Sequence, residues 1–95
     1  MDLKLKNSNV VITGASRGIG KSIATAFAVE GAHLLLVARN QEMLEQTKNE
    51  LEGITSSKIE ILACDVTEAT APLEILEYTQ ERLSGVDILV NNAGT

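Results

Sequence analysis

The 95-residue sequence has too little of several features to belong to some common classes of protein. Its single cysteine, Cys64, excludes an internal disulfide and agrees with a reducing compartment. Its formal net charge of -5 disfavours a nucleic-acid binder, because such proteins use clustered Lys and Arg to neutralise phosphates. No run of about 18 apolar residues could span a membrane, and the amino-terminal segment lacks the apolar core of a signal peptide. We therefore expect a cytoplasmic protein that binds neither nucleic acid nor a membrane.

The composition that remains, with 44% hydrophobic and 22% charged residues, is that of an ordinary globular protein. A chain of this length forms a modest core, so we expect one compact unit that spans residues 1–95. The only histidine, His33, has no Cys, Asp or Glu at ligand spacing. The sequence therefore predicts no metal site.

Strand and helix patterns alternate along the chain. Short runs of aliphatic and β-branched residues predict four strands, at 10–13, 33–38, 59–64 and 87–90. Apolar residues at helical spacing predict three helices. The first carries Ile19, Ile23 and Phe27 and stops at Gly31, and the second spans 41–52 with Asn40 as its N-cap. The third starts at Thr70, carries Leu73, Leu76 and Leu83 and ends near Gly85. The order strand, helix, strand predicts parallel pairing through right-handed crossovers.

These elements predict an α/β fold, a Rossmann-like, doubly wound parallel sheet in strand order 3-2-1-4. The switch point then lies between the first and fourth strands, where such sheets bind ligands. Two helices are expected on one face and one on the other, which leaves the fourth strand as a bare apolar edge. Such an edge invites pairing with another chain, so we expect self-association as a homo-oligomer, aggregation, or a missing carboxyl-terminal half.

The segment TGASRGIG, residues 13–20, lies between the first strand and the first helix. Gly14 can adopt backbone angles closed to other residues, Gly18 lets the main chain approach a pyrophosphate, and Gly20 lets the helix pack closely. The helix N-terminus adds N–H donors and a partial positive charge. The turn therefore predicts a phosphate-binding site.

A phosphate-loop nucleotide-binding protein is an alternative, because residues 15–22 read ASRGIGKS. In that case Lys21 would reach the β- and γ-phosphates, and Ser22 and Asp65 would bind magnesium. The same residues can equally be ordinary first-turn helix residues and the end of a buried strand. The glycine turn by itself leaves both hypotheses open.

Three motifs at three successive strand ends resemble those of the short-chain dehydrogenase/reductase family: TGASRGIG, Asp65-Val66 and Asn91-Asn92-Ala93-Gly94. The resemblance covers nearly the whole chain. It implies that Asp65 accepts a hydrogen bond from the adenine amino group and that Val66 packs against the ring. Asn91 is interpreted as a turn residue. The predicted cofactor-binding residues are Gly14, Ser16, Arg17, Gly18, Ile19, Gly20, Arg39, Asp65, Val66, Asn92, Ala93 and Gly94.

The second strand ends Val37-Ala38-Arg39, without the Asp or Glu that accepts the adenosine ribose hydroxyls in NAD-binding proteins. Arg39 and Arg17 can instead donate to the additional phosphate of NADP. The alternative for Arg39 is a solvated surface side chain. We therefore predict that NADP(H) is preferred over NAD(H).

The resemblance also implies a catalytic Tyr-x-x-x-Lys pair, which this sequence does not contain. Its only tyrosine, Tyr78, is followed four residues later by Arg82, so no catalytic residue is predicted. The family implies hydride transfer between NADP(H) and an alcohol or carbonyl substrate, but we expect this chain alone to be inactive. The alternative is a stand-alone nucleotide-binding module without catalysis.

Overall fold

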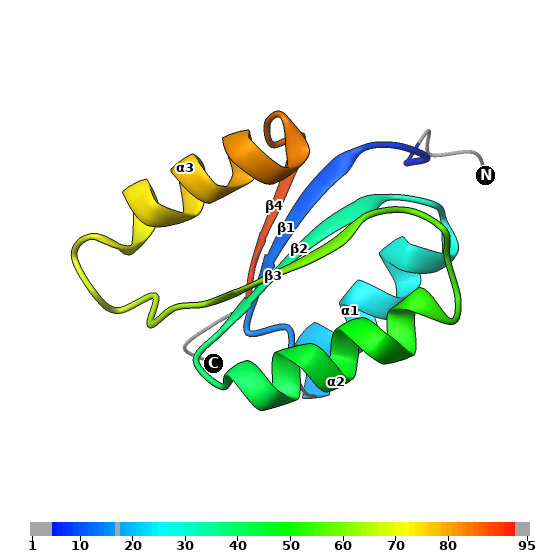
Figure 1. Cartoon of the computed structure of the whole chain (residues 1–95), viewed down its shortest axis with the longest axis horizontal. Helices are drawn as coiled ribbons and strands as arrows, with labels where there is room; N and C mark the ends of the chain where they lie inside the picture. Colours follow the sequence, from blue (N-terminus) through cyan, green and yellow to red (C-terminus); the bar gives the residue numbers. More distant parts are fainter. Residues whose placement is uncertain (1–4, 17, 93–95) are drawn as a thin grey trace.

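The computed structural model describes residues 5–16 and 18–92, in which a four-stranded sheet lies between two layers of helices (Figure 1). In chain order the elements are β1 (Asn9–Thr13), α1 (Gly18–Val29), β2 (His33–Ala38), α2 (Gln41–Glu52), β3 (Ile59–Ala63), α3 (Ala71–Leu83) and β4 (Ile88–Asn91). All pairs are parallel and the order is β3-β2-β1-β4, as predicted. The predicted strand ends differ by at most one residue; for example, β3 ends before Cys64.

Local chemistry explains where the helices begin and end. The Asn40 side chain accepts a hydrogen bond from the Met43 N–H at 3.0 Å, so α2 starts where the sequence predicts. Gly31, with φ of 82°, turns the chain after α1. At the end of α3 the left-handed cap is Ser84, with φ of 70°, one residue before the glycine that the sequence suggested.

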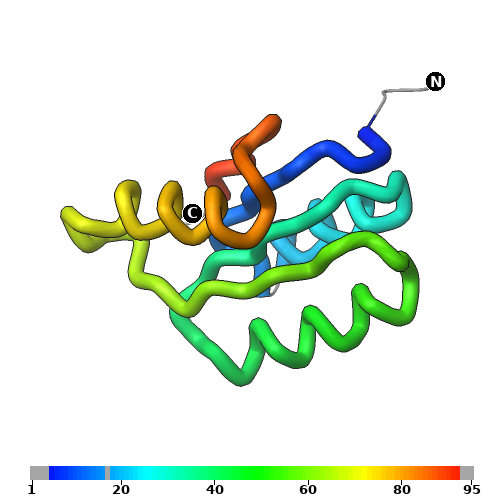
Figure 2. Tube along the Cα trace, turned by 45° about the horizontal axis from the view of Figure 1, so that its top comes forward, coloured from blue at the N-terminus to red at the C-terminus, as the bar shows by residue number. Residues whose placement is uncertain are grey.

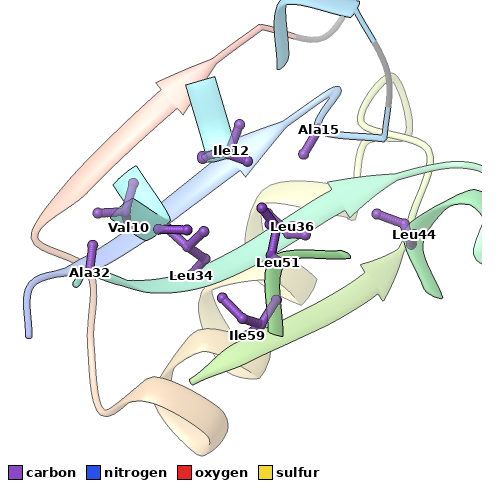
Figure 3. Close-up of a cluster of buried hydrophobic side chains, with 11 residues drawn as sticks. Val10, Ile12, Ala15, Ala32, Leu34, Leu36, Leu44, Leu51 and Ile59 are labelled. Atoms are coloured by element: carbon purple, nitrogen blue, oxygen red, sulfur yellow. The ribbon is translucent and has the colours of Figure 1, made fainter. Parts of the chain in front are cut away.

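The core occupies both faces of the sheet. Val10, Ile12, Leu34 and Leu36 are fully buried on the face that α1 and α2 cover, and Figure 3 shows these side chains together. The residues between them, such as Leu35, are equally buried and form a second cluster on the face of α3. Because both faces are covered, β1 and β2 are continuously aliphatic instead of alternating with polar residues.

Apolar spacing predicted the buried faces of α1 and α3 only in part. Ile19 is 72% exposed, and Leu73 and Leu76 are 60% and 50% exposed. The residues of α1 that are buried are smaller, Gly20 and Ala24 among them. Small side chains allow α1 to lie close to the strands, so the larger apolar residues fall at the margins of the interface or outside it.

Among the described residues, the fourth strand forms an edge of the sheet and pairs with β1 alone. Its Leu89 is 61% exposed, whereas Val11, its partner in register on β1, is fully buried. The position of α3 contributes to this exposure, because α3 packs mainly against β2 and β3 and its carboxyl end leads into β4 (Figures 1 and 2). The apolar edge expected from the sequence is therefore present.

Within the described residues, no helix is long and apolar enough to cross a membrane.

Candidate functional site

A groove of about 1180 Å³ runs along the carboxyl ends of the strands. Parallel strands all end on the same side of a sheet, so the loops that follow β1, β2, β3 and β4 meet there. The predicted site residues that line the groove are Gly14, Ser16, Gly18, Ile19, Arg39, Asp65, Val66 and Asn92. Arg17, Ala93 and Gly94 lie outside the described residues. Gly20 does not line the groove but lies directly beneath it.

The glycine turn is held in place by its neighbours on both sides. Gly14 has φ of 66°, in the left-handed region that favours glycine, and its N–H donates to the Val37 carbonyl of β2 at 2.8 Å. The Asn92 side-chain amide, just after β4, donates to the Gly14 carbonyl at 3.3 Å. Thr47 of α2, which is buried, donates its hydroxyl to the Ser16 carbonyl at 3.4 Å. The backbone groups of Gly14 and Ser16 are therefore held by β2, by α2 and by the residue that follows β4.

Gly20 is the residue through which α1 approaches the turn. A Cβ at this position would overlap the Gly14 carbonyl oxygen and would lie 2.7 Å from the Asn92 side-chain nitrogen. Gly18 is different, because a Cβ there would meet no atom within 4 Å, although its φ of 59° still favours glycine. Close packing therefore requires glycine at position 20, while position 18 faces open space at the rim of the groove.

The ends of β1 and β4 are joined by side chains as well as by the sheet ladder. The Thr13 hydroxyl donates to the Asn91 side-chain oxygen at 3.2 Å and accepts from the Asn92 N–H at 3.0 Å. Asn91 was interpreted as a turn residue, but it is the last residue of β4, and its side-chain oxygen accepts from the Thr13 hydroxyl of β1. These bonds set the position of Asn92 relative to the glycine turn.

A second group of charged residues lies where β2 and β3 end. Thr67 lowers the pKa of Asp65, because its hydroxyl and its backbone N–H both donate to the Asp65 side chain. The exposed Arg39 adds a smaller lowering through its positive charge. Beside them Cys64 is a free, buried cysteine, and burial followed by the charges of Glu74 and Asp65 raises the pKa of its thiol. This end of the groove thus holds a cation, a carboxylate whose ionised form is favoured, and a thiol whose thiolate form is disfavoured.

Other residues that line the groove were not among the predictions. Asn40 and Met43, at the start of α2, lie beside Arg39, and Thr67 follows Asp65 by two residues. The pattern Asp-x-Thr is typical of turns in which the carboxylate accepts from the backbone two residues later, so Thr67 could have been found from the sequence. Met43 carries no such signal, because only the packing of α2 beside β2 brings it to the groove.

The phosphate-loop alternative does not fit the arrangement of its residues. The Lys21 amino group lies 2.6 Å from the carboxylate of Glu50 on α2, and the Ser22 hydroxyl donates back to the Gly18 carbonyl at 3.3 Å. Neither residue lines the groove. Across residues 5–16 and 18–92, no group of three His, Cys, Asp or Glu side chains could hold a metal ion.

Tyr78 packs against the core beneath α3, and the Arg82 guanidinium lies 5.1 Å from the centre of its ring. It does not line the groove. Tyr78 is therefore a packing residue of α3 that has no part in the groove.

Comparisons with known proteins agree with this geometry. The family model for short chain dehydrogenases matches residues 8–95. A fatty acyl-CoA reductase of Acinetobacter baylyi is 42% identical over 90 residues, which is 95% of this chain and 30% of that protein. A 3-ketodihydrosphingosine reductase of Bos taurus is 41% identical, over 97% of this chain and 29% of that protein. The chain thus spans about 30% of the length of these curated relatives.

Solved structures show the same likeness in three dimensions. L-sorbose reductase from Gluconobacter frateurii, in complex with NADPH and L-sorbose, matches with a TM-score of 0.95 and 40% identity, over 100% of this chain and 36% of that one. A hydroxysteroid dehydrogenase from Escherichia coli matches with a TM-score of 0.89 and 33% identity, over 96% and 38%. The family model, the sequence relatives and the fold all lead to one conclusion: this chain belongs to the short-chain dehydrogenase/reductase family of oxidoreductases.

Proposed function

We propose that this chain is the NADP(H)-binding part of a short-chain reductase, with residues 1–95 forming one dinucleotide-binding unit. The observation that carries the proposal is that the glycine turn, Arg39 and Asp65 line one groove along the carboxyl ends of the strands. Such a groove offers hydrogen-bond donors to the phosphates at one position and residues that can recognise the adenosine at another. The related L-sorbose reductase, which was solved with NADPH, supports the choice of cofactor.

Each part of the dinucleotide is assigned to residues of this chain. The turn of Gly14, Ser16, Gly18 and Ile19 would hold the pyrophosphate, because the N-terminus of α1 contributes N–H donors and a partial positive charge there. Gly20 would act indirectly, by allowing α1 to pack against the turn. The turn donates a hydrogen bond to the Val37 carbonyl and accepts from the Thr47 and Asn92 side chains, and these bonds reduce the conformational entropy that binding would otherwise remove.

The adenosine end is assigned to the loops after β2, β3 and β4. Arg39, with Arg17, would donate to the phosphate on the ribose, and an Arg fork suits a phosphate better than a point charge does. Asp65 would accept from the adenine amino group and Val66 would pack against the ring. Asn92, Ala93 and Gly94 would lie along the ribose.

The chemistry that bound NADP(H) supplies is transfer of a hydride to or from an alcohol or carbonyl substrate. The described residues that line the groove include neither a tyrosine nor a lysine, so they do not form the Tyr-x-x-x-Lys pair that the resemblance implies. Because the relatives are much longer than the matched region, we propose hydride transfer for a protein of their length, with this chain alone inactive. The names of the relatives span acyl-CoA, sphingoid, sugar and steroid substrates, so they favour no single substrate class.

We also propose that the exposed apolar edge at β4 mediates contact with a second copy of the chain. Leu89 is 61% exposed on a strand that pairs on one side only. Edge strands with apolar side chains readily pair with another chain unless charge or a covering segment prevents it.

The cytoplasmic location expected from the sequence stays a prediction.

Arg39→Asp is the test of the cofactor assignment. A charge-assisted hydrogen bond contributes about 1.5 to 3 kcal/mol, so the substitution should lower NADPH affinity by roughly tenfold or more and should spare or improve NADH binding. Affinities are measured by titrating cofactor fluorescence. Arg82→Asp is the matched control, since it makes the same change of charge at an exposed arginine that does not line the groove. Unchanged affinity of Arg39→Asp for both cofactors would refute the assignment.

A further inference from the structure

The loop that follows β3 holds its aspartate in a fixed orientation. One side-chain oxygen of Asp65, Oδ1, accepts from the Thr67 backbone N–H at 2.9 Å and from the Thr67 hydroxyl at 2.6 Å. Two bonds to one oxygen restrict rotation of the carboxylate about its last torsion, which is otherwise broad. Both residues line the groove.

The second oxygen of the same carboxylate, Oδ2, accepts no hydrogen bond from the described residues. An ionised carboxylate has about four acceptor sites, of which Thr67 uses two on a single oxygen. The geometry thus separates the two oxygens, one engaged within the loop and one available to a ligand. A hydrogen-bond donor, and no group that only accepts, can bind there favourably.

We propose that Thr67 is a positioning residue that makes the nucleotide site selective for adenine. It does so by holding Oδ1 of Asp65 so that Oδ2 can accept from the exocyclic amino group of the base. The inference rests on the proposed function, since it takes Asp65 to be the residue that recognises adenine. It goes further by assigning base selectivity to a side chain that would not itself contact the ligand.

Selectivity follows from the chemistry of the base. Adenine presents an amino group at the position where hypoxanthine presents a carbonyl oxygen, so the two bases differ there as donor and acceptor. A fixed carboxylate oxygen attracts the first and repels the second. A mobile carboxylate would turn away from the carbonyl and would lose much of this discrimination.

Hydrogen bonds from Thr67 favour the ionised form of the Asp65 carboxylate. Thr67 is the largest cause of its lowered pKa, and Arg39 at the end of β2 adds to it. The adjacent Cys64 thiol is also titratable, and its pKa is raised by burial and then by the charges of Glu74, Asp65 and Glu68. A depressed pKa means that the interaction is present above the ordinary value of 3.8 and is lost only as the pH falls through the lower, folded-state value. Removal of the Thr67 hydroxyl should move this loss to higher pH.

The test compares NADPH with its hypoxanthine analogue in the wild-type chain, Thr67→Val and Thr67→Ser. Valine keeps the shape and the backbone N–H but removes the hydroxyl, whereas serine retains the hydroxyl. We expect wild type and Thr67→Ser to prefer NADPH, and Thr67→Val to narrow the ratio of the two dissociation constants by roughly fivefold. The Asp65 carboxylate, followed by NMR, should titrate at higher pH in Thr67→Val and near the wild-type pH in Thr67→Ser.

The outcomes separate this inference from the proposed function. If Thr67→Val weakens both dinucleotides equally, Thr67 has only a structural role and the inference is overturned. If wild type binds NADPH without preference for adenine, the inference fails while the cofactor assignment stands. A wild-type chain that shows a cooperative unfolding transition but binds neither dinucleotide overturns the proposed function, and this inference with it.

Discussion

Replacement of Gly20 by alanine is the most direct test of how the site is built. The added Cβ would overlap the Gly14 carbonyl oxygen and crowd the side-chain nitrogen of Asn92. Rotation of the Gly14 carbonyl is opposed because the Ala15 N–H, which lies in the same peptide plane, donates to the Val37 carbonyl of β2 at 3.4 Å. The turn and α1 must therefore move apart.

The size of the effect can be worked out from three contributions. Overpacking costs about 1 to 3 kcal/mol, and the steric conflict with backbone atoms favours the upper part of that range. Loss of the bond from Asn92 to Gly14 adds about 1 kcal/mol. Alanine's higher helix propensity offsets up to about 1 kcal/mol. We expect a net destabilisation of about 2 to 3 kcal/mol, a large share of the roughly 5 to 14 kcal/mol typical of a chain this long.

The measurements are urea unfolding followed by circular dichroism and NADPH titration. The unfolding midpoint should fall with little change in the slope, and Tm should drop by roughly 10 to 20 °C. NADPH affinity should fall as well, because the distorted turn is the proposed pyrophosphate site. Gly53→Ala is the control, since its φ is -76° and the nearest atom to the added Cβ is the Glu50 oxygen at 3.4 Å. It should be neutral or stabilising by about 0.5 kcal/mol.

A Gly20→Ala variant within about 0.5 kcal/mol of wild type, and with unchanged NADPH affinity, would refute the reasoning. It would show that α1 can retreat from the turn without consequence. The close approach at Gly20 would then have no importance for the site.

Two further predictions test the alternative function and the exposed edge. Lys21→Met should change stability by less than about 1 kcal/mol and leave NADPH affinity within about twofold, because Lys21 forms a half-exposed ion pair with Glu50. A large loss of nucleotide affinity, or tight binding of magnesium-ATP by wild type, would contradict this prediction. Leu89→Lys should reduce the concentration-dependent self-association that we expect to measure by light scattering. Ile54→Lys, at another exposed apolar position, should not reduce it. A wild-type chain that stays monomeric at all concentrations would disprove the proposed edge contact.

Much of the fold could be read from local patterns. The continuous aliphatic residues of β2 required cover on both faces, and this requirement led to the observed parallel sheet with α1 and α2 on one side and α3 on the other. Asn40 and the glycines at positions 14 and 31 act through their own backbone or their nearest neighbours, so their roles were evident from the sequence. Apolar spacing was a poorer guide to α3, because it does not tell which side of a helix will pack against the sheet. Leu73 and Leu76 were expected on the buried side, but both are exposed.

The candidate site divides in the same way. The sequence by itself determined which residues follow each strand, and a parallel sheet necessarily brings those strand ends together. It could not show that Lys21 pairs with Glu50, that Thr47 reaches the Ser16 carbonyl, or that Asn92 bonds to the glycine turn. These contacts depend on the distance and rotation of packed elements, which no local pattern encodes. Tertiary structure alone decided them, because each one joins residues that only the completed packing brings within reach of a hydrogen bond.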